Sequence, residues 1–268
     1  MKYLTLQNAK TTKGEKKGWL TAILYLAPAR VADKFKNVCP WASAGCLAAC
    51  LYTAGRGRMT KIQQARIDKT LAFHNDKNAF VDILMKDVRA LIRKCQRENL
   101  RPAVRLNGTS DLHWEALFPM NDKEFRGVQF YDYTKGEYRA RASLGVNWLK
   151  NYDLTFSKSE SNYSDCRKVL EAGGRVAAVF QQNFDKLNYD KETGFPRSYA
   201  GFPVVDGDDN DLTFTKRSGV WLALRPKGDA TKDKSGFVVT PEEVYDKDMY
   251  EGVRANAERL RILTDQGW

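Results

Sequence analysis

The sequence lacks the features that mark a membrane protein or a secreted one. None of its apolar runs reaches the roughly 18 residues that a membrane-spanning helix needs, and no apolar segment follows the polar, lysine-rich residues 1–17 as in a signal peptide. Acidic side chains are in deficit, because 44 Lys and Arg stand against 33 Asp and Glu and give a formal charge of +11. We therefore expect a soluble, cytoplasmic protein without a membrane partner, whose substrate or partner is a nucleic acid or a nucleotide.

Cysteine is also scarce, but three of the five cysteines lie close together. Cys39, Cys46 and Cys50 follow the spacing Cys-x6-Cys-x3-Cys and are surrounded by glycine and alanine. Such small residues let a loop wrap closely around an inorganic centre. In a reducing compartment this grouping is more typical of a metal site than of disulfide bonds. We predict that these three cysteines bind a metal centre and that Cys95 and Cys166, each alone in a helical pattern, are buried thiols.

Thiolate ligands are compatible with zinc or with an iron–sulfur cluster. Structural zinc usually has four ligands in paired Cys-x2-Cys motifs, which this sequence lacks. Three close cysteines without an obvious fourth favour a [4Fe-4S] cluster whose last iron is open to another ligand. Zinc held by the three cysteines and a water is the alternative, with His113 or His74 as a candidate fourth ligand.

Short apolar segments alternate with helical patterns along most of the chain. Six strands are predicted to begin at residues 20, 103, 128, 153, 175 and 219, with a smaller piece at Val204–Val205. Helices are predicted over residues 60–75, 78–98, 111–118, 138–149, 164–172 and 241–263. The alternation predicts an α/β fold with a parallel sheet. A partial (β/α) barrel of about six units suits the strands best, and an open doubly wound sheet is the alternative.

The pattern predicts a single domain over residues 1–268. Residues 1–18 form a basic N-terminal edge, residues 19–183 and 213–230 the barrel core, and residues 240–268 a C-terminal helical region. Residues 184–212 interrupt the alternation with several glycines and prolines, which indicates an inserted loop or lid. The acidic residues within Asp206–Asp211 are expected to form a solvated turn, with cation binding as the alternative.

Polar residues follow most of the predicted strands. The carboxyl ends of parallel strands share one rim, so these residues should gather near the cysteine segment. They supply hydroxyls, amides, carboxylates and cations over the segments 105–111, 131–135, 157–162, 181–183 and 225–229. Ser110 or Asp111 alone could simply cap a helix, but the coincidence over five strands predicts a site for a polar, charged molecule. Lys158 and Arg225 are expected on the basic part of this rim.

A cysteine trio after the first strand of a partial barrel resembles the radical S-adenosylmethionine superfamily. The third cysteine is followed here by Leu51 and Tyr52, and the usual spacing in the superfamily is Cys-x3-Cys-x2-Cys. The resemblance implies that Cys39, Cys46 and Cys50 bind three irons of a [4Fe-4S] cluster, while the fourth iron chelates S-adenosylmethionine. By strand order, it implies cofactor-binding roles for Asn107, Gly108, Thr109, Ser157, Ser159 and Lys227, and catalytic roles for Asp111 and Lys135. Lys135, Lys227 and Arg105 would hold carboxylate or phosphate charge.

A second resemblance covers residues 37 to about 230. The segments 37–40, 45–52, 104–111 and 131–135 together are similar to a bacteriophage protein family, the "gene product eighty-eight" type. This resemblance implies that the protein is phage-encoded and works in the cytoplasm of the host cell.

Three functions follow from these observations. The first is an iron–sulfur, radical S-adenosylmethionine-like phage enzyme that modifies a nucleotide or a nucleic acid. The second is a zinc-dependent enzyme that modifies bases in nucleic acid, with Asp111 or Asp132 as nucleophile or base. The third is a metal-stapled, basic nucleic-acid-binding protein that takes over a host process without catalysis.

Overall fold

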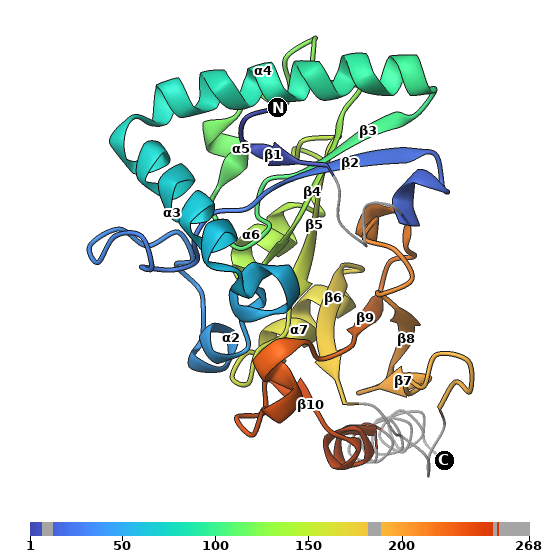
Figure 1. Cartoon of the computed structure of the whole chain (residues 1–268). Coiled ribbons are helices and arrows are strands. Elements are labelled where there is room, and N and C mark those ends of the chain that lie inside the picture. Colours follow the sequence, from blue (N-terminus) through green and yellow to red (C-terminus); the bar gives the residue numbers. More distant parts are fainter. Residues whose placement is uncertain (7–12, 182–188, 249–250, 252–268) are drawn as a thin grey trace, which may run out of the picture.

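The computed structural model describes residues 1–6, 13–181, 189–248 and 251. These residues form a mixed α/β fold around one ten-stranded, mostly parallel sheet (Figure 1). In sheet order the strands are β1 (Leu4–Thr5), β2 (Trp19–Leu24), β3 (Arg101–Arg105), β4 (Gln129–Thr134), β5 (Tyr152–Ser157), β6 (Arg175–Phe180), β9 (Val220–Leu224), β8 (Phe202–Asp206) and β7 (Ser198–Tyr199), and β10 (Val238–Val239) also pairs with β6.

The central strands lie side by side in the order in which the chain forms them. Strands β2 to β6 and then β9 are joined by parallel pairs, while β1 pairs antiparallel with β2 and β7 antiparallel with β8 at the two edges. All six predicted strands are present, so the α/β class and the largely parallel sheet are confirmed. The described part of the sheet is open and does not close into a barrel.

The helices are α2 (Ala44–Ala48), α3 (Thr60–Asn75), α4 (Lys77–Glu98), α5 (Trp114–Leu117), α6 (Glu137–Ala142) and α7 (Tyr163–Glu171), with short 3-10 turns η1 (Leu51–Thr53), η2 (Gly55–Arg58), η3 (Thr213–Thr215) and η4 (Gly228–Lys232). Three helices, α3, α4 and α7, match their predicted bounds closely, and two others, α5 and α6, are much shorter than predicted. Helix α4 starts at the Asp76 cap and ends at Asn99 in the left-handed conformation. Helix α5 starts only at Trp114 because Asn107 side-chain hydrogen bonds hold Ser110 and Leu112 in a turn.

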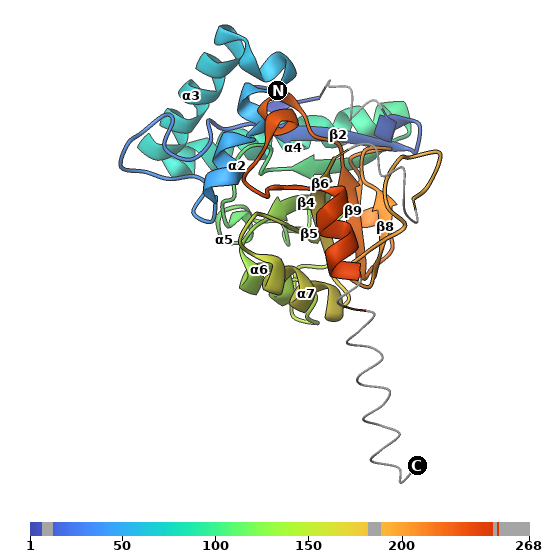
Figure 2. The same ribbon diagram turned by 90° about the horizontal axis from the view of Figure 1, so that it is seen from below.

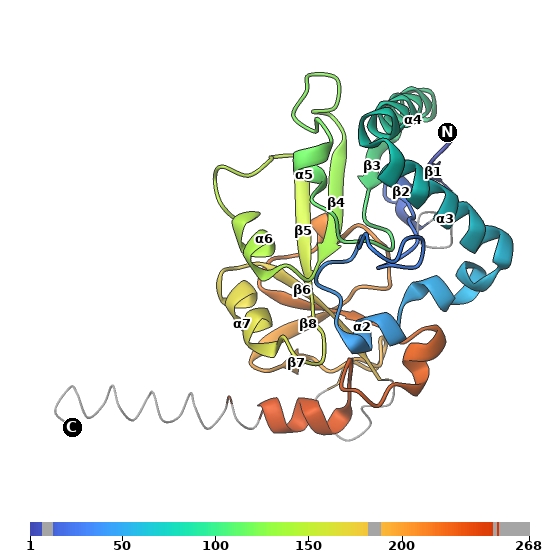
Figure 3. The same ribbon diagram turned by 90° about the vertical axis from the view of Figure 1, so that its left-hand side faces the viewer.

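The helices pack against one face of the sheet. Alternate strand residues such as Leu24, Val104 and Phe130 form one buried cluster with α3 and α4, and Phe156, Val176 and Trp221 form a second with α7. Each fully buried side chain of this size contributes about 1.5–3 kcal/mol. The intervening residues, including Tyr133, Ala177 and Leu222, lie in a separate cluster on the other face. Figures 2 and 3 show α3 and α4 beside β2 and β3, and α6 and α7 farther along the sheet.

The remaining predictions are met unevenly. Cys95 and Cys166 are buried, as predicted. Part of the segment predicted as an insertion or lid instead extends the sheet, because β8 pairs parallel with β9, and residues 182–188 lie outside the described residues. Of the predicted C-terminal helix, residues 241–248 are helical, and residues 252–268 lie outside the described part. Among the described residues, no helix is both long enough and apolar enough to span a bilayer.

Candidate functional site

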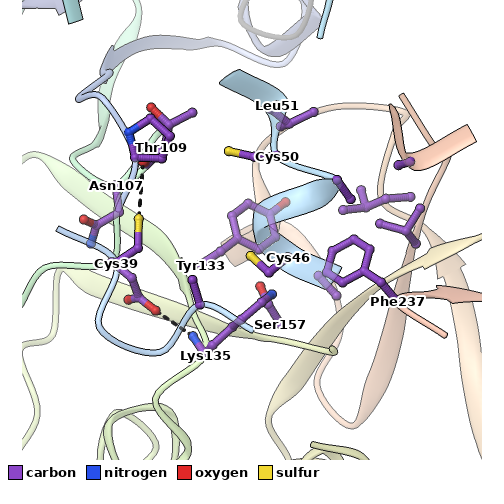
Figure 4. A pocket seen from close by; sticks show the side chains of 18 of the residues that line it. Cys39, Cys46, Cys50, Leu51, Asn107, Thr109, Tyr133, Lys135, Ser157 and Phe237 are labelled. Carbon is purple, nitrogen blue, oxygen red and sulfur yellow. Dashed lines mark hydrogen bonds between the residues drawn. The ribbon is translucent and has the colours of Figure 1, made fainter. Parts of the chain in front are cut away.

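The cysteine segment and the carboxyl ends of the parallel strands line one cavity of about 230 Å³. The loop after β2 supplies the three cysteines, the loops after β3 and β4 supply residues 107–111 and 134–135, and β5 and β9 lead into the others. The cavity is therefore lined by ten of the eleven predicted site residues: Cys39, Cys46, Cys50, Asn107, Gly108, Thr109, Asp111, Lys135, Ser157 and Lys227. Figure 4 shows the three thiols facing one shared space. Ser159 is buried outside this lining, where its amide donates to Asn162 Oδ1 at 2.6 Å.

Helix α2 carries Cys46 and is fixed at its start by Glu160. The Glu160 carboxylate accepts hydrogen bonds from Gly45 N at 2.8 Å and from Ser43 Oγ at 2.7 Å, and Ser43 Oγ accepts from Cys46 N. Partial burial raises the pKa of Glu160, but the Gly45 and Ser43 donors outweigh it and the pKa lies below its ordinary value. A Cβ at position 45 would lie 2.6 Å from Glu160 Oε2, so glycine lets the carboxylate approach the start of the helix this closely. Glu160 lies in the polar segment 157–162, but the sequence pattern did not predict this contact with Gly45.

The other two cysteines lie against backbone groups. Cys39 Sγ accepts from Ala29 N at 3.2 Å and donates to Thr109 O at 3.6 Å, and Thr109 Oγ1 donates to Leu26 O at 2.5 Å. Burial raises the pKa of the Cys39 thiol to about 12, opposed by the Ala29 amide. Burial also raises the pKa of Cys50. Burial therefore favours the protonated form of both thiols, and a bound positive centre would favour the thiolates instead.

The described side chains do not form a ready-made site for a single metal ion. Among them, no three His, Cys, Asp or Glu residues converge closely enough to hold one. The two histidines, considered as a fourth ligand, are engaged elsewhere: His74 Nδ1 lies 3.7 Å from Asp33, and His113 Nδ1 lies 3.5 Å from Glu115. Neither histidine lines the cavity.

Asn107 and Gly108 shape the loop after β3. Asn107 Oδ1 accepts hydrogen bonds from Ser110 Oγ, Leu112 N and Trp114 Nε1. The backbone N of Asn107 donates to Asp132 Oδ1 at 2.7 Å. A Cβ at Gly108 would lie 2.6 Å from Leu24 O, so the loop packs directly on β2. The side chain of Asn107 thus organises the loop, and Asn107 and Gly108 both line the cavity.

Of the two carboxylates considered for catalysis, one lines the cavity and one does not. Asp111 lines it and accepts from Lys135 N at 2.8 Å and from Arg139 Nη1 at 3.1 Å; burial raises its pKa against these donors. Asp132 is fully buried behind the loop, where burial raises its pKa to about 7 against the Asn107 amide. Asp132 is therefore a support for Asn107 rather than an accessible nucleophile.

The cavity is also lined by cationic side chains, and most of them are paired with acidic or carbonyl groups. Lys135 Nζ donates to Lys158 O at 3.3 Å and lies 5.3 Å from the centre of the Phe237 ring. Lys158, expected on an exposed basic rim, is instead buried, with its Nζ 3.3 Å from Glu243. Strand β10 pairs with β6 and places the segment before it over Lys158. Lys158 Nζ donates to Gly236 O in this segment, and the side chain is therefore buried.

The acidic segment 206–211 is not the solvated turn that was expected. Asp208 is buried and pairs with Lys227 Nζ at 2.9 Å, and Asp211 is buried beside Arg105 Nη1 at 3.3 Å. Arg225 also lies close to this segment, donating from its amide to Asp208 Oδ2. The segment therefore neutralises part of the cationic wall of the cavity and fixes its shape.

Comparison with protein families gives a match over nearly the whole chain. Residues 2–241 match the model of the family described as Gene product 88. No curated protein and no solved structure matches the chain.

Proposed function

The chain belongs to the Gene product 88 family, and we propose that it is an iron–sulfur enzyme of the radical S-adenosylmethionine type that modifies a nucleotide or a nucleic acid. One observation supports this proposal most. Cys39, Cys46 and Cys50 line the same cavity as the carboxyl ends of the parallel strands, which is where sites form in folds of this kind.

The fold adds support for a partial barrel. A doubly wound sheet has helices on both faces and a strand order that reverses. Here β2 to β6 and β9 follow each other in chain order, and the clusters that contain α3, α4 and α7 occupy one face. That arrangement is the one expected of part of a (β/α) barrel.

The donor set suits a cluster better than a single ion. A tetrahedral zinc with Zn–S bonds of about 2.3 Å needs ligand atoms that converge tightly, and no described group does so. Three thiols around a shared space suit a [4Fe-4S] cluster, whose irons are bound separately by different thiolates. Cys39, Cys46 and Cys50 would hold it, and with S-adenosylmethionine such a cluster supplies the electron for radical chemistry.

The remaining lining residues have roles that follow from their chemistry. The Ser157 hydroxyl offers a hydrogen-bonding group for the polar parts of a ligand, whereas the backbone amides of Asn107 and Gly108 are already paired with Asp132 and Leu24 O. Lys135 offers positive charge for a carboxylate or a phosphate, whereas Asp208 neutralises part of the charge of Lys227. Asp111, held by Lys135 N and Arg139, can accept a hydrogen bond or a proton from the ligand. Leu47, Leu51 and Phe237 add apolar surface to the same space.

The two alternative functions receive less support from the contacts. A zinc enzyme could use Asp111, which lines the cavity, but not Asp132, whose carboxylate is fully buried. A nucleic-acid-binding surface through Lys158 and Arg225 would need side chains that are instead held by Glu243 and by Thr193 O. Exposed arginines elsewhere could still contact a polyanion, and salt-dependent binding would measure that contribution.

The direct test is cleavage of S-adenosylmethionine. Anaerobically reconstituted protein, given S-adenosylmethionine and a one-electron reductant, should release 5′-deoxyadenosine detectable by mass spectrometry. Lys135→Met should slow this release, and Lys94→Met, on the exposed surface of α4, is the matched control. Protein that holds an iron–sulfur cluster but releases no 5′-deoxyadenosine would overturn the radical mechanism.

A further inference from the structure

Arg66 is buried directly beside the cysteine segment. This residue lies on α3 and is only 8% exposed. Its guanidinium carbon lies 4.8 Å from the ring centre of Tyr25 and 5.6 Å from that of Tyr52. Tyr25 directly follows β2, and Tyr52 stands two residues after Cys50. The guanidinium therefore lies between the start and the end of the loop that carries the three thiols.

The charge of Arg66 is not balanced by a carboxylate in the described part of the chain. Its Nε and Nη1 groups are buried and have no hydrogen-bond acceptor there, and no described Asp or Glu forms an ion pair with it. Burial lowers the pKa of the guanidinium, and the groups near enough to oppose this are Tyr25, Cys50 and Tyr52. Two aromatic faces compensate a buried guanidinium only in part.

A second cation makes the local surplus larger. Lys69, one helical turn after Arg66, donates to Tyr3 O at 3.3 Å. Burial and the neighbouring Arg66 lower the pKa of Lys69 to about 8. The buried Asp87 carboxylate offsets part of the charge of Lys69, but no described carboxylate pairs with Arg66, whose buried charge therefore remains uncompensated.

We infer that Arg66 is the fixed countercharge of the anionic metal centre that the cysteine segment holds, and that it raises the reduction potential of that centre. The inference rests on the proposed function. Three thiolates on a [4Fe-4S] core give a net negative charge that increases by one on reduction. A buried positive charge stabilises the reduced form more than the oxidised form. Arginine suits this role because its guanidinium stays charged when buried.

The test is an anaerobic redox titration of the loaded protein, monitored by electron paramagnetic resonance. Arg66→Met should lower the midpoint potential by about 59 mV, which corresponds to a tenfold change in the one-electron equilibrium. Arg66→Lys should lower it less, since a cation remains. Arg89→Met is the matched control, because Arg89 is an exposed arginine of α4 that pairs with Glu124. An unchanged potential in a fully loaded Arg66→Met protein would overturn the inference and leave the proposed function standing.

A second measurement covers the metal-free chain. In the metal-free chain the uncompensated charge of Arg66 destabilises the fold, so Arg66→Met should raise the unfolding temperature. This increase should disappear or reverse once the cluster is loaded. A metal-free Arg66→Met protein that is less stable than the parent would show that Arg66 acts only through packing, and would overturn the inference. If the parent chain itself binds no iron, the proposed function fails first and the inference fails with it.

Discussion

The amino and carboxyl ends of the parallel strands both carry charged and polar side chains, but they use them differently. At the amino ends, Arg175 pairs with Asp153 and donates to Lys216 O at 3.1 Å. Arg101 lies 4.1 Å from the Trp19 ring centre, and Asn151 Nδ2 donates to three backbone carbonyls. These partners come from strands and loops near the amino ends, and none of these residues lines the cavity at the carboxyl ends.

At the carboxyl ends, side chains of the same kinds surround a cavity. The three thiols lie in it, Lys135 has a carbonyl and a ring for neighbours, and Arg66 has buried N–H groups without an acceptor among the described residues. Buried polar atoms without a hydrogen-bond partner occur at the amino ends too, including Arg175 Nε and Asp153 Oδ1. The carboxyl ends differ because their polar side chains line a shared cavity, where they can act on a ligand. The comparison therefore predicts that mutations at one end change stability and mutations at the other end change the bound centre.

The largest effect is expected for Gly45→Ala. A Cβ there would lie 2.6 Å from Glu160 Oε2 and 2.7 Å from Ser235 Oγ, so both side chains must move and the hydrogen bond from residue 45 N to Glu160 is disturbed. We expect reconstituted protein to lose more than half of its about four irons per chain, because an added Cβ displaces two side chains at the start of α2. Gly127→Ala, before β4 at the amino end, is the control, because a Cβ there meets no atom within 4 Å. Equal iron in both variants would contradict the assigned role of α2.

A pH-dependent effect of a few kcal/mol is expected at Asp132. Its pKa is raised to about 7 in the folded protein, from an ordinary value of 3.8. A raised carboxyl pKa stabilises the fold below about pH 4, and this contribution is lost as the pH rises toward 7. About 4 kcal/mol is the upper limit, at 1.36 kcal/mol per pKa unit. Urea unfolding should show that the stability difference between the parent and Asp132→Asn falls across this window; a constant difference would refute the shift.

These predictions also show what the sequence could and could not reveal. Apolar runs identified all six central strands, and their order placed ten site residues on one rim, because parallel strands end at the same edge. The pattern could not show that Glu160 holds Gly45, since these residues are far apart in sequence and meet only through the fold. Nor could it show that β10 returns to β6 and buries Lys158, or that Arg66 is enclosed by two tyrosines.

A smaller effect, on stability alone, is expected at the amino end. Arg175→Ala leaves Asp153 without its ion-pair partner and should lower the free energy of unfolding by about 2 kcal/mol. The iron content should stay unchanged because the pair lies away from the cavity. Arg141→Ala, which breaks an exposed pair with Glu137, should cost about 0.5 kcal/mol at most. A loss of iron in Arg175→Ala would remove the distinction between the two ends.

The smallest effect is expected for Glu160→Ala. This change removes the acceptor for Gly45 N and Ser43 Oγ, but water can replace part of the lost hydrogen bonding at a partly exposed site. Iron retention during gel filtration should fall roughly twofold, with Glu124→Ala on the protein surface as the control. Glu160→Gln should recover most of the loss, since an amide oxygen can still accept.

The most direct test of the central claim is metal analysis of the anaerobically purified protein. We expect about four irons and four sulfides per chain, lost in the triple variant Cys39→Ala, Cys46→Ala, Cys50→Ala and kept in the double variant Cys95→Ala, Cys166→Ala, whose thiols are buried elsewhere. One zinc and no iron, or iron that persists in the folded triple variant, would contradict the proposal that these three cysteines hold an iron–sulfur cluster.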